Sequence, residues 1–139
     1  MTVEAFDGIQ IKTIQNVVFL VEHDFGADPK HKSFYPKYIE KTGDKMLEIA
    51  IEIHAQAKFA NSIHPENKGQ YEIRVEAQKK AKALVFALLG QYHAVLAILD
   101  VDDNKFVDHI RHLKHQSNCI KSWIDKDKET YRKRKWWKS

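Results

Sequence analysis

Apolar residues recur at helical spacing along nearly all of this 139-residue chain, and that periodicity constrains the fold more than any other feature. The clearest case lies in residues 38–63, where apolar residues are separated by four, three, four and three positions: Met46, Ala50, Ile53, Ala57 and Ala60. This spacing is typical of a helix that packs lengthwise against other helices. No segment alternates strictly between polar and apolar residues, as a half-buried strand would.

Three further segments carry apolar stripes of the same kind. We predict a first helix at residues 5–24, with the stripe Ile11, Ile14, Val18 and Val21. A third helix, at residues 67–99, has the stripe Ile73, Ala77, Ala81, Leu84, Leu88, Tyr92, Val95 and Leu99. A fourth helix follows an N-cap at Asp102 or Asp103 and has the stripe Phe106, Ile110, Leu113, Ser117, Ile120 and Ile124.

The breaks between these segments are short and polar. Residues 26–36 and 61–69 both contain proline and glycine, which end helices. Four helices with such connections predict an all-α, up-down-up-down four-helix bundle. The third helix is almost uncharged from Ala83 to Leu99, which predicts burial against more than one neighbour. Apolar residues off the main stripes predict an exposed patch and hence a homo-oligomer: Ile49, Phe59, Val85, Phe86 and Val107.

Cysteine content and charge indicate where such a protein works. The single cysteine, Cys119, excludes an internal disulfide framework and a cysteine-based zinc site, and it fits a reducing cytosol. The N-terminus does not have the pattern of a signal peptide, and no apolar run approaches the roughly 20 residues that span a membrane. We therefore expect a soluble, cytoplasmic protein. Its net charge is +4, and residues 121–139 alone hold eight Lys or Arg against three Asp or Glu.

We divide the chain into a bundle, residues 1–126, and a basic C-terminal tail, residues 127–139. The tail interleaves cations with aromatic rings, a mixture that binds RNA or single-stranded DNA by neutralising phosphates and stacking on bases. The predicted contacts are Arg111, Lys114, Lys121, Arg132, Lys133, Arg134, Lys135, Trp136, Trp137 and Lys138. Three alternatives stay open: the tryptophans pack on the bundle end, or the tail docks in an acidic protein groove, or it lies on an anionic membrane surface.

The sequence lacks the residue spacing that the catalytic and metal-binding motifs considered below require. No histidine has a glutamate three positions before it, so the Glu-x-x-His motif of di-iron bundles is absent. His109, His112 and His115 step by three and drift around the fourth helix, which suggests solvent-facing histidines. The acidic stretch from Asp100 lacks the glycine and the glutamate of a calcium loop. Cys119 has no base nearby in the sequence, and we expect no enzyme, no cofactor and no metal.

Several short motifs occur in a familiar order. They are Tyr35-Pro36-Lys37, Tyr38 with Gly43, Ala60-Asn61, Phe106 and Ser122-Trp123-Ile124. Over roughly residues 8–126, this order resembles a four-helix-bundle family. That family includes the proteins encoded in 23S rRNA intervening sequences and the accessory variability determinant of diversity-generating retroelements. We take Pro36, Gly43 and Trp123 as structural positions, and we expect Trp123 to be a buried anchor of the bundle because it follows the stripe residue Ile120 by three positions.

The resemblance implies a pentameric ring of bundles without catalysis of its own. Retroelement members bind nucleic acid and a reverse transcriptase, whereas the function of the intervening-sequence members is poorly defined. This chain departs from the family pattern at residues 117–122 and at Tyr92-His93, where family members often carry basic residues. Nucleic-acid binding would then have moved toward the C-terminal tail. The alternative is a structural or scaffolding oligomer that does not bind nucleic acid.

Overall fold

The computed structural model describes residues 3–24, 36–99, 104 and 106–138, and they form four long helices with no strand among them. These are α1 (Val3–Phe19), α4 (Pro36–Ser62), α5 (Lys68–Leu99) and α6 (Val107–Tyr131). A π-helical turn, η1 (Leu20–Asp24), extends α1, and a 3-10 helix, η3 (Lys135–Lys138), ends the described chain. The predicted all-α, four-helix architecture is confirmed.

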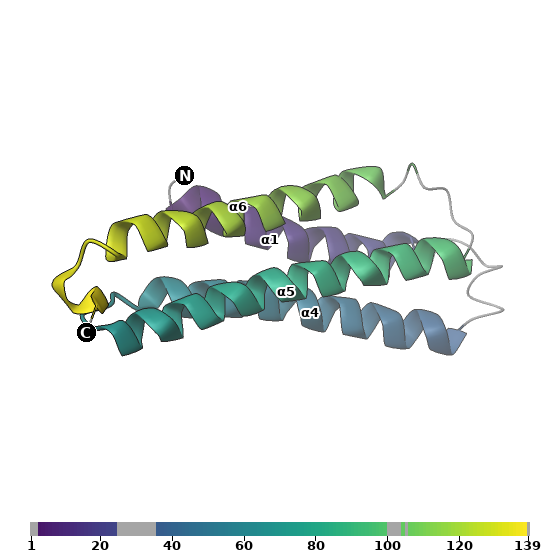
Figure 1. Ribbon diagram of the computed structural model, residues 1–139. Coiled ribbons are helices and arrows are strands. Elements are labelled where there is room, and N and C mark those ends of the chain that lie inside the picture. The colour runs from purple at the N-terminus through teal and green to yellow at the C-terminus, as the bar shows by residue number, and fades with distance from the viewer. Residues whose placement is uncertain (1–2, 25–35, 100–103, 105, 139) are drawn as a thin grey trace.

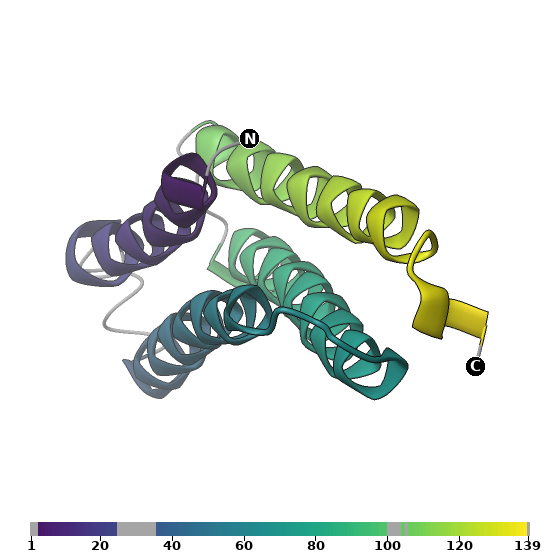
Figure 2. The same ribbon diagram turned by 90° about the vertical axis from the view of Figure 1, so that its left-hand side faces the viewer.

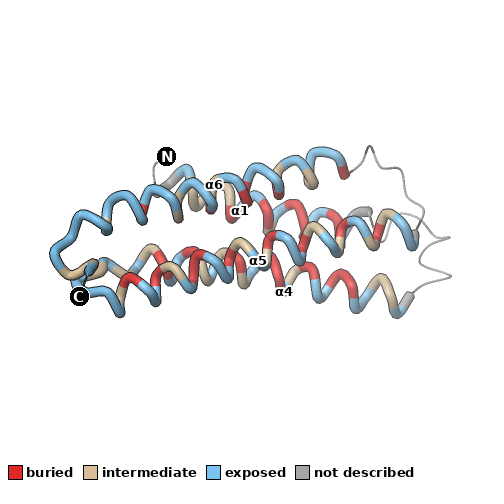
Figure 3. Tube along the Cα trace, viewed as in Figure 1, coloured by how far each residue is buried: buried red, intermediate tan, exposed pale blue. Residues whose placement is uncertain are grey.

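Successive helices run in opposite directions, which is the predicted up-down-up-down arrangement (Figure 1). Seen from the end in Figure 2, α1 lies beside α4 and α6, and α5 lies beside the same two helices. Buried positions face the interior of this arrangement, whereas the C-terminal end is largely exposed (Figure 3). Each helix therefore has two neighbours and one outward face.

The stripes predicted for the second and fourth helices are confirmed. All five stripe residues of α4, from Met46 to Ala60, are buried. On α6, Phe106, Leu113, Ser117 and Ile120 are buried, while the other two stripe residues are half-buried. Regular 3–4 spacing of apolar residues was a sufficient signal on these two helices.

On α1 and α5 the prediction was partly wrong. Ile11 is 44% exposed and Ile73 is 52% exposed, so neither belongs to the core. The buried face of α1 is rotated by one residue from the predicted stripe: Gln10, Thr13, Val17 and Leu20. On α5, Arg74 is buried in place of Ile73. Both faces contain polar residues that find partners inside the bundle, and an apolar stripe cannot reveal such positions.

The off-stripe apolar residues divide into two groups. Ile49 and Val85 are buried in the core, contrary to prediction. Phe59, Phe86 and Val107 are exposed, as predicted. The uncharged half of α5 does pack against α4 and α6, but its outward face stays open at Ala83, Phe86, Ala87, Gly90, Ala97 and Ile98.

The length and composition of α5 would allow it to cross a membrane. A core helix of a soluble protein passes the same test, and α5 packs along two neighbouring helices here. The fold is therefore compatible with a soluble protein.

The start of α6 differs from its prediction. Phe106 occupies the N-cap position, without a side-chain cap, and its carbonyl accepts the N–H of Ile110 at 2.9 Å. Asp102 and Asp103 lie outside the described residues. At its other end α6 continues to Tyr131, so the boundary drawn after residue 126 falls inside this helix.

Candidate nucleic-acid interface

The C-terminal tail is a folded part of the bundle end. After α6 ends, the N–H of Arg134 donates to the carbonyl of Tyr131 at 3.0 Å, and that of Trp137 donates to the carbonyl of Arg134 at 3.1 Å. These turns bring η3 back toward the start of α5 (Figure 1). The predicted cations of residues 132–138 are thus presented on a short, turned segment rather than along a straight helix.

Four aromatic rings hold this segment against the bundle. The ring centroid of Tyr71, at the start of α5, lies 5.5 Å from Tyr131, 6.2 Å from Trp136 and 5.0 Å from Trp137. Tyr71 is buried, whereas both tryptophans are only half-buried. The contacts are in the range of favourable aromatic pairs. Both tryptophans therefore pack on the bundle end and still present part of their surface to solvent.

A buried ion pair joins α5 to the last turns of α6. Nε of Arg74 donates to Oδ2 of Asp127 at 2.6 Å, and its NH2 group donates to Oδ1 at 3.2 Å. Nε2 of Gln78 donates to Oδ2 of the same carboxylate at 2.6 Å. The NH1 group of Arg74 also donates to the carbonyl of Ile63, between α4 and α5, at 2.9 Å. The pair thus connects three helices beneath the tail.

Aromatic rings surround this ion pair. The guanidinium carbon of Arg74 lies 5.3 Å from the ring centroid of Trp123 and 5.9 Å from that of Tyr131, within cation–π range. Burial raises the pKa of Tyr71, and the negative charge of Asp127 raises it further. The Tyr71 phenol therefore stays neutral at physiological pH, which suits its place in the aromatic cluster.

All eight predicted cations are exposed, and their side chains differ in what they contact: Arg111, Lys114, Lys121, Arg132, Lys133, Arg134, Lys135 and Lys138. Arg132 pairs with Glu129 at 2.9 Å and Arg111 with Asp108 at 3.5 Å, both at the surface. Arg134 lies 5.8 Å from the Tyr131 ring centroid. Within the described residues, the five lysines of this set have no carboxylate partner. They are available to a polyanion.

One further lysine extends the basic surface, and the sequence prediction missed it. Lys128 follows Lys121 by seven residues, about two turns of α6, so both share the flank that faces away from α1. A periodic search for lysines at seven-residue spacing could have found Lys128.

The histidines of α6 contact neighbouring helices. Nδ1 of His109 lies 2.9 Å from the hydroxyl of Tyr92, and Nε2 of His112 lies 2.9 Å from the carbonyl oxygen of Ile9. Both histidines are half-buried, so only His115 is as exposed as predicted. Among the described residues, no group of three or more His, Cys, Asp or Glu is arranged to hold a metal.

Cys119 does have a base beside it, contrary to the sequence interpretation. Its Sγ atom lies 3.6 Å from Nε2 of His115, one turn earlier on α6. Burial raises the pKa of the Cys119 thiol, so it stays protonated at neutral pH. A protonated thiol is a poor nucleophile, and this pair does not resemble an activated cysteine.

The three predicted structural positions occupy different surroundings. Pro36 is the first residue of α4, where its missing N–H costs no helical hydrogen bond. Gly43 is buried two turns later. Trp123 is half-buried rather than fully buried, and its ring lies edge-on to Phe6 at a centroid distance of 4.9 Å.

Comparisons with known protein families, with characterised proteins and with solved structures gave no significant match to this chain.

Proposed function

We propose that this protein is a non-catalytic, cytoplasmic accessory protein that binds RNA or single-stranded DNA through its C-terminal end. The observation that carries the proposal is the folded tail, where exposed cations surround two half-exposed tryptophans. Cations neutralise phosphates, and exposed indole rings stack on unpaired bases. The motif order described above supports the diversity-generating retroelement type, with a reverse transcriptase as a further partner.

We further propose that the protein acts as a homo-oligomer, a pentameric ring by its resemblance. The outward face of α5 supports self-association, because it carries no charged residue from Ala83 to Ile98 and stays exposed at Phe86 and Gly90. An uncharged helix face of this length is unusual next to water. Five tails in one ring would act together, so that weak phosphate contacts at each tail add up.

The test of nucleic-acid binding neutralises three exposed lysines of the tail. Lys133, Lys135 and Lys138 are changed together to Gln, which leaves in place Tyr71, Tyr131, both tryptophans and the Arg134 guanidinium on the Tyr131 ring. The matched control changes three exposed lysines on the first turns of α4, at the other end of the bundle: Lys37, Lys41 and Lys45. A fluorescently labelled single-stranded oligonucleotide is titrated with each protein at two salt concentrations.

We expect the tail variant to bind at least about tenfold more weakly than the unchanged protein at low salt, and the control to bind normally. The slope of log K against log salt should also become shallower, by roughly 0.7 for each phosphate of the single strand that the variant no longer neutralises. Equal affinity of the tail variant would place the site elsewhere. Absence of binding by the unchanged protein at low salt would favour the second candidate.

That second candidate is a structural or scaffolding oligomer without nucleic-acid binding. The packing of Trp136 and Trp137 on Tyr71 favours it, because rings used to close the bundle end have less surface to offer to bases. Light scattering tests the oligomeric state that both candidates require. A clean monomer at micromolar concentration would contradict the oligomer in both.

A further inference from the structure

A pocket opens beside α6 and is lined by residues of α1, α4 and α6. It encloses about 720 Å³ and lies between the first turns of α1, the last turns of α4 and the middle of α6. Its walls are largely apolar and include Phe6, Ala57, Cys119 and Trp123. A cavity of this size accommodates a small organic molecule.

The aromatic part of the pocket is held in place from several sides. Trp123 lies edge-on to Phe6, and the guanidinium of Arg74 lies over its ring at 5.3 Å. Arg74 is itself fixed by the buried ion pair with Asp127. The Trp123 ring is therefore positioned before any ligand arrives, which lowers the entropic cost of binding a flat ring against it.

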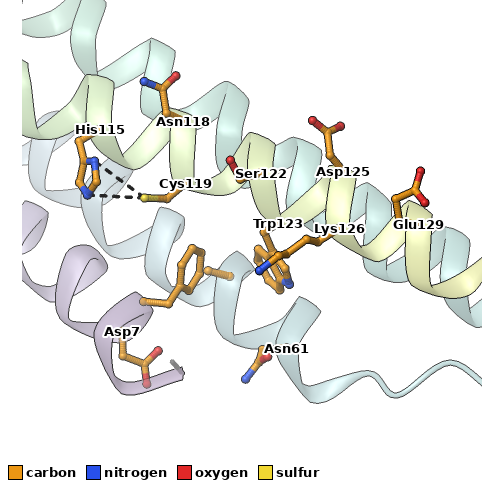
Figure 4. Close-up of a pocket in the computed structure, with 12 residues that line it drawn as sticks. Asp7, Asn61, His115, Asn118, Cys119, Ser122, Trp123, Asp125, Lys126 and Glu129 are labelled. Carbon is orange, nitrogen blue, oxygen red and sulfur yellow. Dashed lines mark hydrogen bonds between the residues drawn. The ribbon is translucent and has the colours of Figure 1, made fainter. Parts of the chain in front are cut away.

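One ammonium and three carboxylates belong to residues that line the pocket: Lys126, and Asp7, Asp125 and Glu129. Figure 4 shows the Lys126 side chain reaching back toward Trp123, whereas Asp125 and Glu129 point to the outer side of α6. Lys126 has no carboxylate partner within the described residues. The one acidic group on the inner side, Asp7, already pairs with Lys58 at 2.7 Å. The ammonium of Lys126 is thus the charged group that lies toward the aromatic wall of the pocket.

We propose that this pocket binds a small molecule with a flat aromatic ring and an adjacent negative charge. The ring packs against Trp123 and Phe6, and the anionic group lies at the ammonium of Lys126. Both an aromatic carboxylate and a free nucleotide have this chemistry. Neither the tail nor nucleic-acid binding is needed for this site, so the inference stands apart from the function proposed above.

The test follows the tryptophan indole N–H signals by NMR, because the chain has three tryptophans and only Trp123 lines the pocket. The probes are 2-naphthoate, its neutral analogue 2-naphthalenemethanol, and adenosine 5′-monophosphate. We expect saturable shifts of the Trp123 signal with 2-naphthoate, while the signals of Trp136 and Trp137 stay unchanged. No saturable shift of Trp123 with either anion would overturn the proposal.

Two variants with the same new side chain locate the site. Cys119→Phe places a ring inside the pocket and should weaken binding at least tenfold. Val107→Phe adds the same ring at an exposed position of α6 that does not line the pocket, and should leave binding unchanged. Equal effects of the two variants would contradict the proposed location.

Lys126→Gln tests the anionic part of the proposal and does not depend on how Cys119→Phe folds, because Lys126 is exposed. The unchanged protein should prefer 2-naphthoate to the neutral alcohol about fivefold, the strength of an exposed ion pair, and the variant should lose that preference. Equal binding of both probes to the unchanged protein would refute the role of Lys126. If adenosine 5′-monophosphate binds as well as 2-naphthoate, the ligand class is a nucleotide. If 2-naphthoate alone binds, the ligand class is an aromatic acid.

Discussion

Helices α4 and α5 are joined mainly by apolar side chains, whereas α6 is joined to its neighbours by polar contacts at intervals along its length. Both helices carry buried alanines, among them Ala50, Ala57, Ala77 and Ala81, whose small side chains allow neighbouring helices to approach closely. On α6, the polar contacts involve His109, His112, Gln116 and Asp127.

The two sides therefore specify the fold in different ways. Apolar surfaces attract without direction, so small residues and shape must determine how α4 meets α5. Hydrogen bonds need matched partners, and a shift of α6 by one turn would leave buried groups such as Gln116 and Asp127 without them. We infer that the polar contacts fix the register of α6 on α1 and α5.

We expect the largest loss of stability at the buried ion pair between Arg74 and Asp127. Asp127→Ala leaves Arg74 as an unpaired charge with only 9% of its side chain exposed, and should lower the free energy of unfolding by about 3–5 kcal/mol. Asp125→Ala, two residues earlier and exposed, is the control and should have little effect. Urea unfolding followed by circular dichroism measures both. If the two variants unfold alike, the ion pair does not hold α6.

The stability of the α4–α5 contact should instead be sensitive to a larger side chain. Ala81 is fully buried, so Ala81→Leu should destabilise the bundle by about 3 kcal/mol through overpacking. Ala83 is exposed on the same helix, and Ala83→Leu should leave the free energy of unfolding nearly unchanged. Thermal unfolding of both variants makes the comparison. Equal tolerance of leucine at the two positions would show that close packing does not define the α4–α5 contact.

A polar contact in the middle of α6 should matter less than the ion pair, because no charge is involved. The hydroxyl of Thr13 donates to Oε1 of Gln116 at 2.7 Å, and Nε2 of Gln116 donates to Oε1 of Gln10. Gln116→Leu leaves the buried Gln10 oxygen without this donor and should cost about 2 kcal/mol. The double variant Gln10→Leu with Gln116→Leu should recover part of that loss in urea unfolding. A double variant less stable than Gln116→Leu would contradict this account.

The same contrast explains what the sequence could and could not predict. Apolar spacing was enough for α4, where Met46, Ile53 and Ala60 are all buried. It failed for Ile11 and Ile73, because the neighbouring positions Gln10 and Arg74 are buried through partners more than 50 residues away. Hydrogen-bond partners at such separations leave no trace in a local pattern.

The candidate sites show the same limit. The exposed cations of the tail were predictable, since a run of Lys and Arg has few ways to be buried. The turn that places Trp137 on Tyr71 was not predictable, because it depends on a contact between two residues that are far apart in the sequence. Nor was the pocket, whose walls come from Phe6, Ala57 and Trp123 on three separate helices.

The smallest predicted effect concerns pH and the contact of His112 with α1. Burial lowers the pKa of His112, and the neutral ring donates its Nε2–H to the carbonyl of Ile9. Because the folded state then binds a proton less readily than the unfolded state, this histidine should reduce stability as pH falls below about 6.5. His112→Gln keeps a donor at the equivalent position but does not titrate. Between pH 8 and 5.5, the melting temperature of this variant should therefore fall slightly less than that of the unchanged protein. A variant with the steeper fall on acidification would show that His112 does not weaken the α1–α6 contact when it is protonated.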